Sequence, residues 1–298
     1  MKPDTLAKFA RSQTRSRLKS VSVAVRRATK HPQEPETAHD LRVAIRRFTQ
    51  CQRMFEGLFT AHSAEKVHKP MHKLMSLAGA KRNYDIGLEL LAEAGLQPQS
   101  SVMMKFREKR NDELKALARY LGRKKIRRDA DAWPKQLHAA DEPSGEWQWA
   151  AGPGENARRM LPPWVAKFFV DGEIVVDARG DHQVLHQFRL HTKQLRYALE
   201  VFLPVYGAEL KPKLLALRTL QDRMGAINDC VTVLALPGVD RAAAQAVNRL
   251  LVKREAALRR YWRETFPPPS SKRWIRDLMR QRRKHSRSTR PRRVGTSA

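Results

Sequence analysis

Two segments about half a chain apart place a histidine and two basic residues at one-turn spacing. They are His39, Arg42 and Arg46 in the first segment and His186, Arg189 and Lys193 in the second. On a helix, the three side chains of each segment stack along one face. No carboxylate shares that face, although like charges one turn apart repel each other. Because arginine donates paired hydrogen bonds to phosphate oxygens, the two stripes predict a site for a phosphate-rich anion.

The stripes need helices to align them, and apolar residues on the opposite face indicate such helices. Phe48 and Phe55 lie opposite the first stripe, and Phe202 lies opposite the second. Arg53 continues the first stripe and Arg196 continues the second. Each segment is therefore expected to bury one apolar face and to present one basic face.

A second pair of related segments follows the stripes at nearly the same distance. Gly79-Ala80-Lys81-Arg82-Asn83 recurs as Gly225-Ala226-Ile227-Asn228-Asp229. Two matched segments in the same order indicate an internal duplication.

The chain between its proline and glycine clusters has the 3.6-residue periodicity of helices. Eight helices are expected, at about 4–30, 36–59, 63–80, 98–122, 154–170, 180–205, 209–230 and 240–264. Thr37 and Asp40 have the spacing of a capping box at the start of the second helix. The only strand candidate is the run from Glu173 to Val176.

In these residues the sequence resembles the CHAD family, the conserved histidine α-helical domain. HDLRVAIRRF and LHQFRLHTKQLRYALEVF are similar to its two signature helices, and GAKRNYD and GAINDC to its secondary motifs. The resemblance implies an all-α fold of two four-helix bundles related by a pseudo-twofold duplication, with a basic central cavity or groove. It also implies binding of inorganic polyphosphate and association with polyphosphate granules.

The resemblance covers about residues 5–265, with halves at about 5–125 and 152–265 and a Trp- and Gly-rich linker at 126–151. The expected polyphosphate ligands are His39, Arg42, Arg46, Arg47, Arg53, Arg82, His186, Arg189, Lys193 and Arg196. Because protonation of the two histidines favours a bound polyanion, binding is expected to be tighter near about pH 6 than pH 8. His191 falls on the apolar side of its helix and is expected to be a packed structural residue.

Charge supports a polyanionic partner. The 298 residues include 59 Lys and Arg against 30 Asp and Glu, a formal net charge of +29. Residues 266–298 form a basic tail that is expected to be largely disordered. Within it, Trp274, Ile275, Leu278 and Met279 could form one short amphipathic helix. The tail offers a secondary contact with nucleic acid or an anionic surface. No apolar run is long enough to span a membrane, and the expected location is the cytoplasm.

Two other functions compete with polyphosphate binding. Charge alone fits a nonspecific RNA or DNA binder, although the aromatic residues fall in the predicted core and not among the bases, where they could stack on nucleobases. His39-Asp40 is the dipeptide of HD-type metal phosphohydrolases, but Arg42 and Arg46 share the face of His39 and would repel a metal ion. The sequence therefore favours a binding protein without catalytic residues, bound metal or cofactor.

Overall fold

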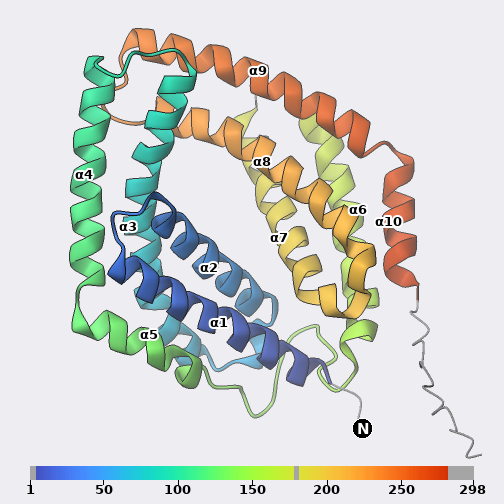
Figure 1. Cartoon of the computed structure of the whole chain (residues 1–298). Coiled ribbons are helices and arrows are strands. Elements are labelled where there is room, and N and C mark those ends of the chain that lie inside the picture. Colours follow the sequence, from blue (N-terminus) through green and yellow to red (C-terminus); the bar gives the residue numbers. More distant parts are fainter. Residues whose placement is uncertain (1–4, 178–180, 281–298) are drawn as a thin grey trace, which may run out of the picture.

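The computed structural model describes residues 5–177 and 181–280, and these form an all-helical protein (Figure 1). Its α-helices are α1 (Leu6–Lys30), α2 (Pro35–Met54), α3 (Ala61–Glu93), α4 (Ser101–Leu121), α5 (Lys124–Gln136), α6 (Pro153–Asp177), α7 (His182–Tyr206), α8 (Lys211–Leu234), α9 (Arg241–Thr265) and α10 (Pro269–Met279). Two 3₁₀ turns, η1 (Glu56–Leu58) and η2 (Gly207–Leu210), precede α3 and α8. Within the described ranges, no helix combines the length and apolar composition of a membrane span.

Helix contacts follow the same order in both halves of the chain. In the first half α1 packs on α2, α2 on α3, α3 on α4, and α5 on α1; in the second α6 packs on α7, α7 on α8, α8 on α9, and α10 on α6. The halves meet where α2 contacts α7 and α3 contacts α8 (Figure 1). This order agrees with an internal duplication. Each described half contains five helices, so the expected pair of four-helix bundles is not confirmed.

All eight expected helices are present, and several are longer than expected. The secondary motif at Gly79 lies inside α3 and not at its end. The strand candidate from Glu173 to Val176 was wrong, because these residues continue α6 and place Val176 in the core. The capping box was also wrong. Glu34 is the residue that precedes α2, and the Thr37 hydroxyl donates a hydrogen bond to the Glu34 carbonyl at 2.8 Å.

Two helices lie outside the eight expected ones, in the expected linker and the expected tail. α5 occupies the first part of the expected linker, because Ile126, Ala130 and Trp133 recur at helical spacing and are buried. In the expected tail, α10 confirms the short amphipathic helix. Trp274 is 5% exposed, and its ring stacks on Phe168 at a centroid distance of 6.2 Å. Residues 281–298, which make up the rest of the tail, lie outside the described residues.

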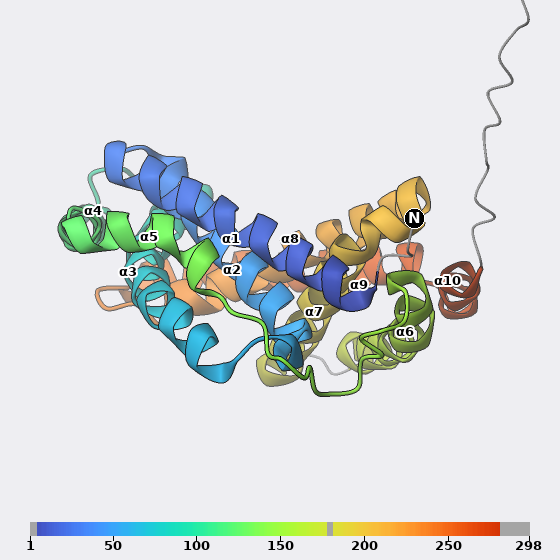
Figure 2. The same cartoon turned by 90° about the horizontal axis from the view of Figure 1, so that it is seen from below.

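The chain between α5 and α6 closes the seam between the halves with aromatic rings. Trp147 lies against Phe55, which directly follows α2, and against Phe202 of α7, at centroid distances of 5.5 and 6.0 Å. The same chain holds the start of α1, because the backbone N–H of Leu6 donates to the carbonyl of Ala151 at 2.8 Å. Seen from below in Figure 2, this chain crosses from α5 to α6 beneath both halves. Trp147 therefore joins the two halves.

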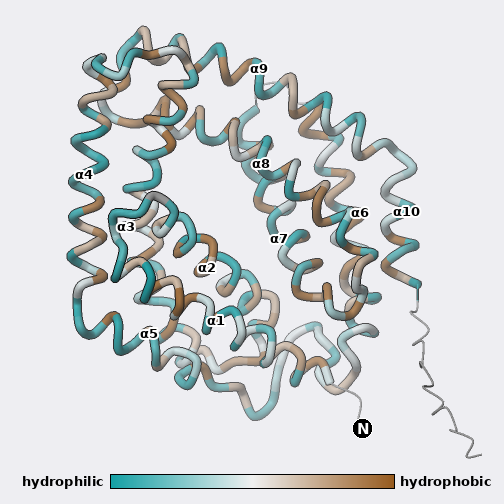
Figure 3. Tube along the Cα trace, viewed as in Figure 1, coloured by the Kyte–Doolittle hydropathy of each residue, from teal (hydrophilic) through white to brown (hydrophobic). Residues whose placement is uncertain are grey.

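The helices follow the apolar periodicity of the sequence. Figure 3 shows hydrophilic and hydrophobic residues mixed along the helices. Side-chain oxygens cap several starts: the Asp181 carboxylate accepts from the backbone N–H groups of Gln183 and Val184 at 2.9 and 3.0 Å at the start of α7. Such caps fix where α7 begins, and with it the direction in which the second basic stripe points.

Candidate anion-binding site

The contact between α2 and α7 brings the two basic stripes together. Six bases from three helices influence one another electrostatically and are called the basic cluster below. They are Arg42 and Arg46 of α2, Arg82 of α3, and Arg189, Lys193 and Arg196 of α7. All six were expected ligands. The structure therefore unites residues that are far apart in the sequence.

The charges of the cluster reach across the boundary between the halves. Burial, together with the nearby charges of four arginines, lowers the pKa of Lys193 to about 7; the arginines are Arg189, Arg46, Arg196 and Arg42. Arg46 and Arg42 belong to the first half, whereas Lys193 belongs to the second. Burial and the charges of Arg46 and Arg82 together lower the pKa of Arg42 to about 10. The free cluster is therefore crowded with positive charge.

Hydrogen bonds to neutral groups hold the arginines in place. Arg42 Nη1 donates to the carbonyl of Met75 at 2.9 Å, and Arg189 Nη2 donates to Asn228 Oδ1 at 3.1 Å. A Cβ at Gly79 would lie 2.4 Å from Arg42 Nη1, so the missing side chain makes room for this guanidinium. The secondary motifs at Gly79 and Asn228 thus position the signature helices' bases.

Four cations of the cluster form no ion pair within the described residues: Arg42, Arg46, Arg189 and Lys193, although the charge of Asp229 acts on Arg189. The other two are partly neutralised. Arg82 forms an ion pair with Glu89 at 3.2 Å, and Arg196 pairs with Glu200. Unpaired, half-buried cations are costly unless an anion joins them. The four are therefore the strongest candidates for direct contact with a ligand.

One carboxylate borders the cluster, and the sequence did not identify it as part of the site. Burial raises the pKa of Asp229, while the charges of Arg189, Arg82 and Arg254 lower it. Arg254 of α9 itself pairs with Glu93 at 2.6 Å and donates to the carbonyl of Ala226. The GAIND motif contains Asp229 and could have indicated this residue. Nothing in the sequence indicated Arg254, which lies outside both motifs.

Two clefts open beside the basic cluster. The larger, of about 1290 Å³, lies between α2, α3 and the chain before α6, and Arg46, Arg53 and His72 line it. The smaller, of about 520 Å³, lies between α2, α6 and α7 and shares Arg53 with the first. Arg46 is the one member of the basic cluster that lines either described cleft, and Glu56, Glu65 and Glu142 also line the larger one. The expected basic central groove is therefore not confirmed.

Four expected ligands lie apart from the basic cluster. Arg47 lines a different cleft and approaches Glu200 at 3.9 Å, since the next residue on a helix is turned by about 100°. Arg53 is exposed and lines both of the clefts described above. His39 and His186 are exposed and make no hydrogen bond or ion pair with any residue the structure describes.

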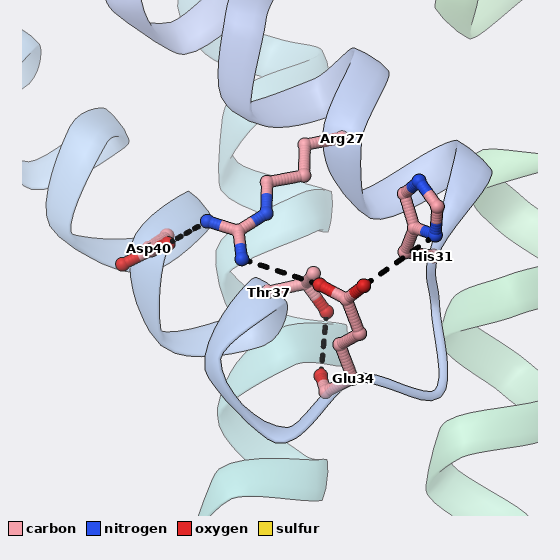
Figure 4. A network of polar contacts seen from close by, with 5 residues as sticks. All are labelled: Arg27, His31, Glu34, Thr37 and Asp40. Carbon is pink, nitrogen blue, oxygen red and sulfur yellow. Dashed lines mark hydrogen bonds and ion pairs between the residues drawn. The ribbon is translucent and has the colours of Figure 1, made fainter.

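Two further histidine hypotheses can be compared with the structure. Asp40 of the HD dipeptide forms an ion pair with Arg27 at 2.8 Å, in a network that also includes Glu34 and His31 (Figure 4). That network joins α1 to α2. The expectation that His191 is packed in the core was wrong. Its ring is half exposed, and its Nδ1 lies 2.6 Å from Asp171 Oδ2 of α6.

Comparison with protein families decides what kind of domain this is. The family model of the CHAD domain matches residues 12–237. The chain belongs to the CHAD family. The matched region contains every residue of the basic cluster and ends just after α8. CHAD domains are associated with polyphosphate-related proteins.

Two solved structures share the CHAD fold at low sequence identity. The CHAD domain from the plant Ricinus communis is 18% identical, with a TM-score of 0.60 over 94% of this chain and 93% of that one. PptA from Streptomyces chartreusis is 16% identical, with a TM-score of 0.58 over 88% of this chain and 99% of that one. No curated protein matches the chain. At these identities the similarity establishes the CHAD fold alone.

Proposed function

We propose that this CHAD protein binds inorganic polyphosphate in the basic cluster. The observation that carries the proposal is the convergence of Arg42, Arg46, Arg189 and Lys193 from both halves, with no ion pair to a carboxylate among the described residues. Polyphosphate presents one negative charge per unit at short, regular intervals. A cluster of arginines, which donate paired hydrogen bonds, and a lysine, which acts as a point charge, can contact several successive units.

The surroundings of the cluster favour a plain phosphate chain over nucleic acid. Single-stranded nucleic acid is bound by exposed aromatic rings that stack on its bases. Here the one aromatic ring against the cluster, Tyr197, is 5% exposed and already lies under the Arg196 guanidinium at 4.4 Å. Nucleic-acid binding remains the competing function, and competition experiments distinguish the two.

The cellular role follows from binding and not from catalysis. We infer that the protein associates with polyphosphate granules in the cytoplasm and organises or targets them. The cluster contains cations and no nucleophile–base pair, which supports a binding role.

Adjacent arginines of α2 provide the sharpest test. Arg46→Ala removes a cation of the cluster, whereas Arg47→Ala removes the same charge one residue away, outside the cluster. We expect Arg46→Ala to weaken polyphosphate binding by about tenfold to a hundredfold, the range for one lost charge-assisted contact. Arg47→Ala should weaken it by less than about twofold. Titration calorimetry at about 0.15 M salt measures both.

Two arms of this experiment address the nucleic-acid alternative. RNA and duplex DNA are added as competitors, and the salt dependence of the affinity is measured for each variant. Arg46→Ala should also reduce the slope of log affinity against log salt by about one. Equal losses in the two variants, or equal competition by RNA, would contradict the proposed site.

A further inference from the structure

The smaller cleft, at the seam between the halves, has walls of a different chemistry from the basic cluster. Its volume of about 520 Å³ is in the usual range for small-molecule sites. Three aromatic rings and two thioethers line it: Trp147, Trp164, Tyr197, Met54 and Met160. We propose that this cleft binds a nucleotide, with the base among the aromatic rings and the phosphate group at Arg53. The proposal does not depend on polyphosphate binding.

The walls of the cleft are held in place by the protein itself. Trp147 Nε1 donates a hydrogen bond to the carbonyl of Met54 at 2.7 Å, which fixes the indole ring. The backbone N–H of Ser144 donates to the carbonyl of Gly57 at 2.9 Å. A Cβ at Gly57 would lie 2.1 Å from the Ser144 carbonyl oxygen, so only glycine allows the chain before α6 to approach this closely. The cleft is therefore formed before a ligand enters.

Several polar groups that line the cleft have no partner in the protein. The side chains of Trp164, Tyr197, Gln50 and Gln194 make no hydrogen bond with any residue that the structure describes. Tyr197 is 5% exposed, and a buried tyrosine hydroxyl usually finds a partner. These groups are free to bond the nitrogen and oxygen atoms at the edge of a ligand.

Aromatic rings together with amides are suited to a nucleobase. Indole rings provide stacking surfaces for any base, and each glutamine amide offers both donors and an acceptor. Glu56 and Glu146 are exposed and also line the cleft, where their carboxylates can accept from the amino group of a base. A purely apolar ligand would leave these groups unpaired. A cationic ligand is disfavoured because Arg53 lines the same cleft.

Arg53 is placed to hold the phosphate group of the nucleotide. It is exposed, forms no ion pair within the described ranges, and lines both clefts, so it stands where they adjoin. Its guanidinium can donate paired hydrogen bonds to phosphate oxygens. Beyond it the larger cleft contains Arg46 but also Glu65 and Glu142. This mixture of charges favours a short phosphate group over a long chain.

The experiment compares three ligands of the full chain by calorimetry at about 0.15 M salt: ATP, tripolyphosphate and adenosine. Tripolyphosphate has the phosphates without the base, and adenosine has the base without phosphates. We expect ATP to bind at least about tenfold more tightly than tripolyphosphate, because only ATP stacks on the aromatic rings. ATP should also bind more tightly than adenosine, and Arg53→Ala should reduce that difference. Equal affinities for ATP and tripolyphosphate would overturn the proposal.

Two glutamines of α7 provide a matched pair of variants. Gln194 lines the cleft, whereas Gln187 lies two turns earlier on the same helix, is exposed and lines a separate cleft. Gln194→Ala should weaken ATP binding by about threefold to tenfold and leave tripolyphosphate binding unchanged. Gln187→Ala should change neither. Equal effects of the two substitutions on ATP binding would contradict a base in this cleft.

The role of stacking is tested at Trp164. Trp164→Leu should weaken ATP binding by at least about fivefold and tripolyphosphate binding by less than about twofold. Equal losses for the two ligands would contradict stacking on this ring. If Trp164→Leu fails to fold, the comparison of Gln194→Ala with Gln187→Ala still decides.

A base of single-stranded RNA has the same chemistry as the base of a free nucleotide. An oligoadenylate therefore forms the last arm of the experiment, and Trp164→Leu should weaken its binding less than that of ATP. An equal or larger loss for oligoadenylate would assign the cleft to RNA and overturn the nucleotide proposal. Failure of the chain to bind polyphosphate would contradict the proposed function and leave this inference intact.

Discussion

Among the bases of the cluster, Lys193 is the one whose charge can change near neutral pH. Its pKa of about 7 in the free protein reflects burial and four arginines. A bound polyanion neutralises that surrounding charge and raises the pKa. The bound protein therefore holds a proton at Lys193 that the free protein has begun to lose, and binding takes up protons.

Polyphosphate affinity should consequently be greatest below about pH 7 and should fall as the pH rises from there. One linked proton limits the fall to about tenfold per pH unit. Lys193→Arg keeps a positive charge throughout and should remove this fall. Binding isotherms between pH 6.5 and 9 test it, and the same pH dependence in both proteins would show that Lys193 is not its source.

At the residue scale, the sequence predicted which bases the fold brings together. Helical spacing selected Arg42, Arg46, Arg189 and Lys193, because residues three and four apart share a face. Arg47 was chosen as well, and it lines a different cleft. The lowered pKa of Lys193 could not be predicted, since it depends on burial and on arginines of the other half.

At the scale of elements, the two secondary motifs differ in how closely they approach the signature helices. Gly79 of α3 lies against Arg42, whereas a Cβ at Gly225 of α8 would have no heavy atom within 4 Å. Both glycines are inside helices, where alanine is favoured by about 0.5–1 kcal/mol. The same substitution thus has different consequences in the two halves.

Gly225→Ala should raise the free energy of unfolding by up to about 1 kcal/mol and leave binding unchanged. Gly79→Ala should gain less stability, because Arg42 must move and lose its bond to Met75. Its polyphosphate affinity should fall by about threefold to tenfold. Urea denaturation and calorimetry measure the two effects, and unchanged binding in Gly79→Ala would show that the position of Arg42 is unimportant.

α10 is a structural element of the second half and not part of a loose tail. Trp274 enters an aromatic group with Phe168, Phe169 and Phe266, and Tyr206 donates its hydroxyl hydrogen bond to the Leu278 carbonyl at 3.1 Å. The sequence showed the apolar stripe of α10, but it did not show that this stripe packs on Phe168 and Phe169 of α6. A protein ending at residue 266 would therefore lose part of the core.

Trp274→Ala should lower the free energy of unfolding by about 3–5 kcal/mol, the usual cost of deleting a buried large aromatic side chain. Met279, at the end of the same helix, is 52% exposed. Met279→Ala should therefore change the free energy of unfolding by less than about 0.5 kcal/mol. Urea denaturation compares them. A small effect of Trp274→Ala would mean that α10 does not contribute to the folded core.

For the whole molecule, the basic terminal segment and the basic cluster should have different effects on the preference for polyphosphate over RNA. Residues 281–298 contain seven Lys and Arg and no acidic residue, and they lie outside the described structure. Removing them should weaken binding of polyphosphate and of RNA by a similar factor, because positive charge by itself attracts both polyanions. Arg46→Ala should instead change the ratio of the two affinities. Competition assays with residues 1–280 measure that ratio, and a large loss of preference on truncation would place selectivity in the terminal segment.

The order in which the chain is synthesised gives the seam between the halves a particular significance. The first stripe, on α2, is made well before α7, and the backbone hydrogen bonds from the start of α1 to the segment before α6 form only after Trp149 and Ala151 have been added. Domains fold from the N-terminus as they are made. A nascent chain therefore presents Arg42 and Arg46 for a time without the second stripe, at the surface of a ribosome that is itself a polyanion. Once α7 is complete, its bases join Arg42 and Arg46 in the basic cluster. The full positive charge of the cluster therefore forms only after synthesis has passed the midpoint of the chain.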